Sequence, residues 1–157
     1  MSAPQREARW PAEADLVRAL FLEYQADIGL DLGFQGFAAE LAGLPGAYAP
    51  PVGCLLLAEG PLGALGCVGL RPFAAGVAEL KRLWVRPHAR GRGLGEALTT
   101  GAIAAAREAG FGRIQLDTLP SMTGALRLYR RLGFVPVAPY RVNPVPGTVY
   151  LTLSLDR

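Results

Sequence analysis

The chain has 157 residues, 51% of them hydrophobic, and a formal net charge of +3 at pH 7. One domain over residues 1–157 would bury roughly 70% of the surface exposed by its unfolded form, so it requires neither a metal nor a disulfide for stability. No apolar run reaches the roughly 18 to 20 residues that cross a bilayer, and residues 1–9 lack a signal-peptide core. Cys54 and Cys67 have no metal-ligand or redox spacing and are expected to be reduced core thiols. These features predict a cytoplasmic protein without a structural metal or a membrane partner.

The apolar spacing predicts strands and helices alternating along the chain. A short strand precedes an amphipathic helix and a second, shorter helix that ends at Gly43. Three strands separated by glycine and proline follow as an antiparallel meander, and small residues then recur at helical spacing. The expected strands cover residues 6–10, 52–58, 62–71, 77–86, 112–119, 134–137 and 148–155, and the expected helices cover 12–28, 34–42, 93–109 and 122–132. The order β-α-α-β-β-β-α-β-α-β-β favours an α/β sheet with helices on both faces over a helix bundle or a β-sandwich.

A glycine-rich segment, Arg90-Gly91-Arg92-Gly93-Leu94-Gly95, connects an expected strand to an expected helix. Such a connection presents free backbone N–H groups at the positive end of a helix dipole, which favours an anion such as pyrophosphate. The surrounding basic residues support an anionic ligand; they are Lys81, Arg82, Arg86, Arg90 and Arg92, with His88 among them. The chain contains no Walker A motif, and Glu96 and Leu98 occupy the third-glycine positions of a dinucleotide fingerprint. The pattern that the segment does match is [RQ]-x-x-G-x-[GA].

In that pattern Arg90, Gly93 and Gly95 resemble the acetyl-CoA pyrophosphate loop of the GNAT N-acetyltransferase superfamily. Residues 79–87 (ELKRLWVRP) resemble the strand that precedes this loop, and residues 125–134 (ALRLYRRLGF) resemble the A-x-x-L-Y-x-x-x-G-F signature. Together these segments extend from residue 77 to about residue 137. The resemblance implies a mixed, mostly antiparallel central sheet flanked by helices and an acyl-CoA-dependent N-acyltransferase.

The resemblance also implies how the acyl donor, acetyl-CoA, is bound. The spacing of Leu80, Leu83 and Val85 fits a β-bulge. In the superfamily such a bulge splays the strand from its neighbour, and the pantetheine arm lies in the gap. The residues implied to bind the donor are Leu83, Trp84 and Val85 around the thioester, and Arg90, Gly91, Arg92, Gly93, Leu94, Gly95 and Glu96 around the pyrophosphate. Many members have an asparagine where this chain has Met122, so donor contacts from that segment stay open.

Two residues are implied to be catalytic, because in the superfamily an amine attacks the thioester directly in a ternary complex. Tyr129 takes the place of the signature tyrosine and is the candidate general acid, since a phenol stays protonated at neutral pH. Its helical spacing also fits a core tyrosine. Glu79 is the candidate general base. Burial would raise the pKa of its carboxyl, whereas Lys81 or Arg82 would lower it, and a charge pair with these two residues is the alternative.

The acceptor is expected opposite the donor, between the first two helices and the last strands. Candidate substrate residues in these segments are Tyr24, Phe34, Phe37, Tyr140, Arg141 and Asn143. Arg141 favours a small amine that carries a carboxylate, although residues 140–144 also fit an ordinary turn. The expected function is transfer of an acetyl group from acetyl-CoA to a primary amine of a small molecule, by a monomer or homodimer.

Three other functions are weighed against this one. They are acetylation of a protein N-terminus or lysine, a catalytically silent CoA-binding regulatory module, and nucleic-acid binding. The silent module is disfavoured because Tyr129 and Glu79 are both present. Nucleic-acid binding is disfavoured because the positive charges are concentrated at one glycine loop, and no series of aromatic residues alternates with them as a stacking platform would require.

Overall fold

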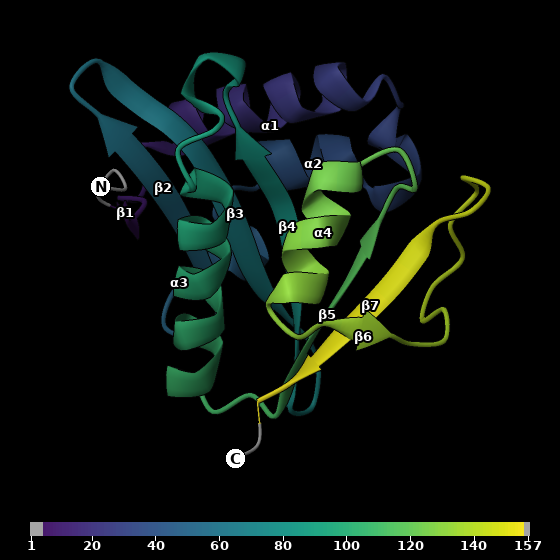
Figure 1. Ribbon diagram of the computed structural model, residues 1–157. Helices are drawn as coiled ribbons and strands as arrows, with labels where there is room; N and C mark the ends of the chain where they lie inside the picture. The colour runs from purple at the N-terminus through teal and green to yellow at the C-terminus, as the bar shows by residue number, and fades with distance from the viewer. Residues whose placement is uncertain (1–4, 156–157) are drawn as a thin grey trace.

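The computed structural model describes residues 5–155, in which one open sheet carries helices on both of its faces (Figure 1). The strands of this sheet lie in the order β1-β2-β3-β4-β5-β7-β6. The strands are β1 (Gln5–Glu7), β2 (Cys54–Gly60), β3 (Gly63–Ala74), β4 (Val77–Val85), β5 (Arg113–Thr118), β6 (Val135–Pro136) and β7 (Val149–Ser154). The helices are α1 (Ala14–Ile28), α2 (Phe37–Ala42), α3 (Leu94–Glu108) and α4 (Thr123–Arg131), with 3-10 turns η1 (Leu32–Gln35), η2 (Gly46–Tyr48) and η3 (Pro87–Ala89).

The predicted order of strands and long helices is confirmed, as is a mixed, mostly antiparallel sheet. Pairing is antiparallel throughout except between β4 and β5, which run parallel and are connected through α3. The helix expected over residues 34–42 is divided, because Gly36 has φ +69° and separates η1 from α2. A left-handed backbone conformation of this kind cannot continue a right-handed helix.

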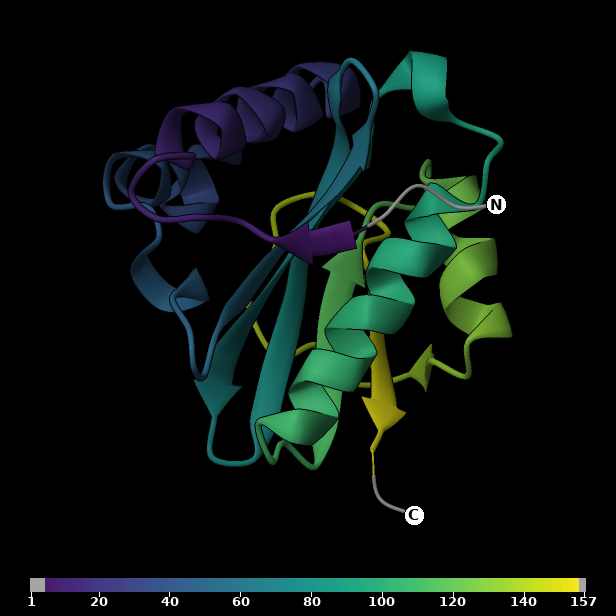
Figure 2. The same ribbon diagram turned by 90° about the vertical axis from the view of Figure 1, so that its left-hand side faces the viewer.

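Figure 2 shows helices on both faces of the sheet, and a hydrophobic core lies beneath the helices of each face. α1 and α2 cover one face, where Leu20 and Phe21 are fully buried. α3 and α4 cover the other, and the small side chains of Ala102 and Ala106 allow α3 to pack closely on the sheet. The cysteines are buried free thiols, as predicted. Among residues 5–155, no helix is long and apolar enough to span a membrane.

β4 and β5 separate from one another partway along their length. Their pairing ends at Glu79 and Gln115, although β4 continues to Val85 and β5 to Thr118. On the other side of β4 the register with β3 gains one residue, and Arg82 adopts φ +61° there. This is the predicted β-bulge, which increases the local twist of β4. Beyond Glu79, the edge of β4 that faces β5 therefore has no strand partner among the described residues.

Candidate active site

A cavity of about 520 Å³ opens where β4 and β5 separate, between the first turns of α3 and α4. Five of the residues predicted to bind the donor line it, namely Leu83, Trp84, Val85, Arg90 and Gly95. The other predicted donor residues, in the same loop and the first turn of α3, do not line it. Of these, Gly91, Arg92, Gly93 and Glu96 are exposed, whereas Leu94 is buried in the core under α3. The glycine loop therefore borders the cavity through Arg90 and Gly95.

The glycine loop provides unpaired backbone donors next to this cavity. Gly91 and Gly93 have φ values of +82° and +75°, a left-handed conformation in which glycine is unstrained. The helical hydrogen bonds of α3 begin with the amide of Ala97, which donates to the carbonyl of Gly93. Among the described residues, none accepts a hydrogen bond from the amides of residues 91–96. A row of free amides at a helix N-terminus is suited to bind phosphate groups.

The basic residues predicted around the loop divide into two groups. Arg90 and Arg92 are exposed beside the loop, and the guanidinium of Arg90 lies over the Trp84 ring at 5.0 Å while donating to the Val85 carbonyl at 3.0 Å. Arg86 turns away from the loop and pairs with Glu23 of α1 at 2.8 Å. Lys81 and Arg82 are buried on the α1 and α2 face of the sheet. Two arginines rather than the whole basic cluster are therefore available near the loop.

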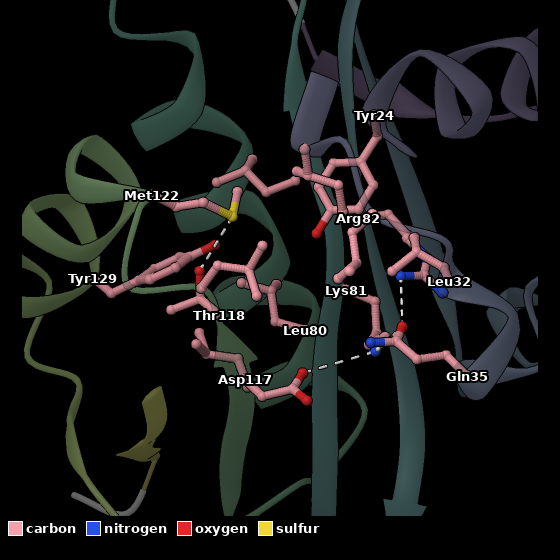
Figure 3. A pocket seen from close by; sticks show the side chains of 15 residues that line it. Tyr24, Leu32, Gln35, Leu80, Lys81, Arg82, Asp117, Thr118, Met122 and Tyr129 are labelled. Atoms are coloured by element: carbon pink, nitrogen blue, oxygen red, sulfur yellow. Dashed lines mark hydrogen bonds and ion pairs between the residues drawn. The ribbon is translucent and has the colours of Figure 1, made fainter. Parts of the chain in front are cut away.

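A second, smaller cavity of about 40 Å³ adjoins the first and contains Tyr129 (Figure 3). Tyr24, Ile28, Leu83 and Met122 line both cavities. The hydroxyl groups of Tyr24 and Tyr129 point into this space from opposite sides. The small cavity therefore forms the inner end of the groove between the splayed strands.

Tyr129 combines a buried ring with a hydroxyl that reaches the small cavity. The residue is 6% exposed, and its ring packs on Phe134 with 5.6 Å between centroids. Within the described chain, no group exchanges a hydrogen bond with this hydroxyl. Burial raises the pKa of the Tyr129 phenol, and Tyr24 raises it further. The proton therefore stays on the phenol across the neutral pH range.

Lys81 lines the same small cavity and is the only lysine in the chain. It is 5% exposed, its Nζ donates to Gln35 Oε1 at 3.0 Å, and it lies 3.8 Å from an Asp117 oxygen. Burial, followed by the positive charge of Arg82, lowers the pKa of its ammonium group to about 8. Lys81 was predicted only as part of a basic cluster, and no local pattern in the sequence indicated its burial.

Glu79 is fully buried, at 0% exposure, and both of its carboxylate oxygens have partners. Oε1 accepts from Arg71 at 3.0 and 3.1 Å, and Oε2 accepts from Tyr140 at 2.9 Å and pairs with Arg141 at 2.6 Å. Burial raises the pKa of this carboxyl, but the positive charges of Lys81, Arg141 and Arg71 outweigh burial, so the net shift is downward. Arg71 was not predicted as a partner, although it stands directly opposite Glu79 in the β3–β4 hairpin.

The residues predicted to contact the acceptor lie in different settings. Tyr24 lines both cavities, whereas Tyr140 is bound to Glu79. Asn143 accepts from the Val145 amide at 2.9 Å and contacts Asp117 at 3.4 Å, which stabilises the loop before β7. The side chain of Phe34 lies outside the described part of the structure. In the described range there is also no cluster of three or more His, Cys, Asp or Glu side chains placed to hold a metal.

Comparison with known proteins identifies relatives of this chain. Residues 15–134 match the sequence model of the Acetyltransferase (GNAT) family. An uncharacterised N-acetyltransferase from Schizosaccharomyces pombe is 40% identical over 94% of this chain and 91% of its own length. A GNAT family acetyltransferase from Staphylococcus aureus shares the fold with a TM-score of 0.81, at 18% identity over 99% of this chain and 100% of that chain. A GNAT family acetyltransferase from Elizabethkingia anophelis with acetyl-CoA bound gives a TM-score of 0.55, at 24% identity over 66% of this chain and 76% of that chain.

Proposed function

The chain belongs to the GNAT acetyltransferase family, and we propose that it transfers an acetyl group from acetyl-CoA to the primary amine of a small molecule by direct attack in a ternary complex. One observation carries this proposal. The groove between β4 and β5 runs from the free amides of the glycine loop to the hydroxyl of Tyr129. This arrangement supports binding of an elongated donor that is anionic at one end and reactive at the other.

Two groups of residues are proposed to bind different parts of acetyl-CoA. The amides of residues 91–96 and the side chains of Arg90 and Arg92 are suited to the pyrophosphate. The unpaired edge of β4 near Leu83 to Val85 offers backbone groups to the pantetheine arm and to the thioester carbonyl, where negative charge develops during attack. The acetyl-CoA bound to the protein from Elizabethkingia anophelis supports the same donor for this fold.

In the proposed reaction the amine nitrogen forms a bond to the thioester carbon, and the carbon–sulfur bond breaks. The attacking nitrogen loses one proton, and the departing thiolate gains one, which gives the acetamide and free CoA. Tyr129 supplies the proton to sulfur, because its phenol is protonated at neutral pH and has no competing hydrogen-bond partner among the described residues.

Glu79 was predicted to accept the proton from the amine. Its contacts instead favour a role in positioning neighbouring side chains. Its carboxylate is enclosed by Arg71, Tyr140 and Arg141, and its lowered pKa makes it a weak base. We infer that Glu79 is a counter-ion that positions the two guanidinium groups. The amine then loses its proton to solvent or to a group reached through solvent. The alternative is the prediction that Glu79 is the general base. The dependence of kcat/KM on pH in Glu79→Gln, compared with that of the wild type, distinguishes the two roles.

The test is release of free thiol from acetyl-CoA with a panel of small amines, followed for the wild type and for Tyr129→Phe. Wild-type release should depend on an amine. Tyr129→Phe should lower kcat by roughly 10²-fold with little change in acetyl-CoA affinity, because the ring packing on Phe134 is retained.

Tyr24→Phe is the matched control, since it removes the other hydroxyl that enters the small cavity. A greater loss of kcat in Tyr24→Phe than in Tyr129→Phe would assign the general acid to Tyr24. Binding of acetyl-CoA without thiol release from any amine would support a silent CoA-binding module. Release with a peptide amine alone would support a protein acceptor.

A further inference from the structure

We propose that the acceptor amine carries a carboxylate and that Arg71 and Arg141 bind this carboxylate in a cavity beside the small cavity that contains Tyr129. This inference rests on the proposed function and names the substrate class of the same site. The cavity has a volume of about 290 Å³ and is lined by Gln35, Arg71, Arg141 and Val142. Two guanidinium groups therefore face a space large enough for the polar end of a small molecule.

The carboxylate cavity adjoins the small cavity that contains Tyr129. Gln35 lines both spaces, and its Oε1 accepts from Lys81 at 3.0 Å and from Arg82 at 2.8 Å (Figure 3). Asp117 lines the small cavity, where a carboxylate is a favourable neighbour for an amine. An acceptor with its carboxylate on the arginines can therefore direct its amine past Gln35 toward the Tyr129 hydroxyl.

The charges around the cavity leave one positive charge in excess. Ion pairs connect seven side chains into one network, with cations Arg71, Lys81, Arg82 and Arg141 and anions Glu40, Glu79 and Asp117. The anions are at most 9% exposed, whereas Arg71 and Arg141 are 24% and 21% exposed. The accessible part of this network is therefore cationic. A single excess charge fits a carboxylate better than a phosphate, which carries nearly two negative charges at neutral pH.

Both guanidinium groups are held in place before any ligand binds. The buried carboxylate of Glu79 contacts Arg71 through Oε1 and Arg141 through Oε2. Arg141 also lies over the rings of Tyr140 and Phe73, at 5.1 and 5.8 Å from their centroids. Each guanidinium has five N–H donors, and these contacts leave some of them available to a ligand. Prearranged donors of this kind bind a carboxylate with little loss of side-chain entropy.

The test compares the common L-amino acids with their amino-acid amides, in the same thiol-release assay. An amide keeps the side chain and the amine but replaces the carboxylate with a neutral group. The amide also lowers the pKa of the amine, so a larger fraction of it is in the reactive neutral form. The proposal predicts that kcat/KM for the preferred acid is roughly 10- to 100-fold higher than for its amide. This ratio corresponds to the strength of charge-assisted hydrogen bonds.

Arg141→Lys and Arg71→Gln should raise KM for the acid by roughly 10-fold or more and leave the amide nearly unaffected. Arg127→Gln, an exposed change on α4, is the control that should alter neither. The stabilisation of each variant by acetyl-CoA confirms that it is folded. Equal kcat/KM for acid and amide, or equal loss for both in the arginine variants, overturns the carboxylate site and leaves the acetyltransferase proposal intact. Thiol release with other small amines but with neither amino acids nor their amides also overturns the carboxylate site and leaves acetyl transfer intact. No thiol release with any amine of the panel contradicts acetyl transfer itself, and the carboxylate proposal falls with it.

Discussion

The ammonium group of Lys81, the only lysine of the protein, lies in the interior, where the residue lines the small cavity that contains Tyr129. Its pKa in the folded state is about 8, against an ordinary value of 10.5. Between these two pH values the unfolded chain binds more protons than the folded chain does, so stability rises with pH. Lys81 is charged in both states below pH 8, and there the folded state bears the full penalty of burying its charge.

Replacing this lysine with methionine provides a test of that penalty. Between pH 7 and pH 9.5, the free energy of unfolding of the wild type should rise by about 2 kcal/mol relative to that of Lys81→Met. Urea denaturation of both proteins at the two pH values measures this difference. Exposed Arg127→Gln should show no such change. An unchanged difference between wild type and Lys81→Met would mean that the ammonium is not desolvated.

At the scale of elements, β4 shows which part of the site could be predicted from sequence. The spacing of its apolar residues predicted a bulge, because an extra residue shifts the alternation by one. It could not identify Arg82 as the residue with φ +61°, because that conformation is held by hydrogen bonds to Glu40 at 2.9 and 3.1 Å and to Gln35 at 2.8 Å, all distant in sequence. The glycine loop could be predicted because its backbone conformation depends on glycines within the loop itself. The partners of Glu79 could not be predicted, since Arg141 comes from the loop before β7.

The first turn of α3 provides a prediction about the donor groove. A Cβ added at Gly95 would lie 3.6 Å from a Leu128 methyl, an ordinary contact, and would project into the cavity between α3 and α4. Gly95→Ala should therefore leave stability unchanged or raise it by up to about 1 kcal/mol through helix propensity. Its affinity for acetyl-CoA should fall by roughly 10-fold or more, because the new methyl group narrows the groove at the point where the donor's pyrophosphate approaches the loop amides. Calorimetric titration measures the affinity and thermal denaturation the stability.

Thr100→Ala is the matched control for this change. It lies on the same helix, is exposed and does not line the groove, so it alters helix propensity without touching the donor. Acetyl-CoA should bind this variant like the wild type. Equal affinities for Gly95→Ala and Thr100→Ala would contradict the course proposed for the donor.

At the scale of the molecule, the sheet consists of two parts joined along a short seam. Strands β1 to β4 form one part and β5 to β7 the other, and within residues 5–155 only residues 77–79 pair with residues 113–115 between them. The order of the elements was predictable because each has its own periodicity. The placement of β7 between β5 and β6 was not, because strand pairing over this separation depends on tertiary packing rather than on local pattern.

A donor that lies in the gap between these two parts should stabilise the whole protein and protect a local set of amides. At a hundred times its dissociation constant, acetyl-CoA should add about 2.7 kcal/mol to the free energy of unfolding and raise Tm by roughly 5 to 10 °C. Hydrogen exchange should slow most at residues 83–85 and 91–96, where β4 lacks a partner and the loop amides are free. The paired amides of β2 serve as the internal reference, because they lie far from the gap in the sheet order. A Tm increase with equal slowing in β2 and in the loop would show that the donor does not bind in the gap, since contact protection is local whereas global stabilisation slows exchange throughout the core.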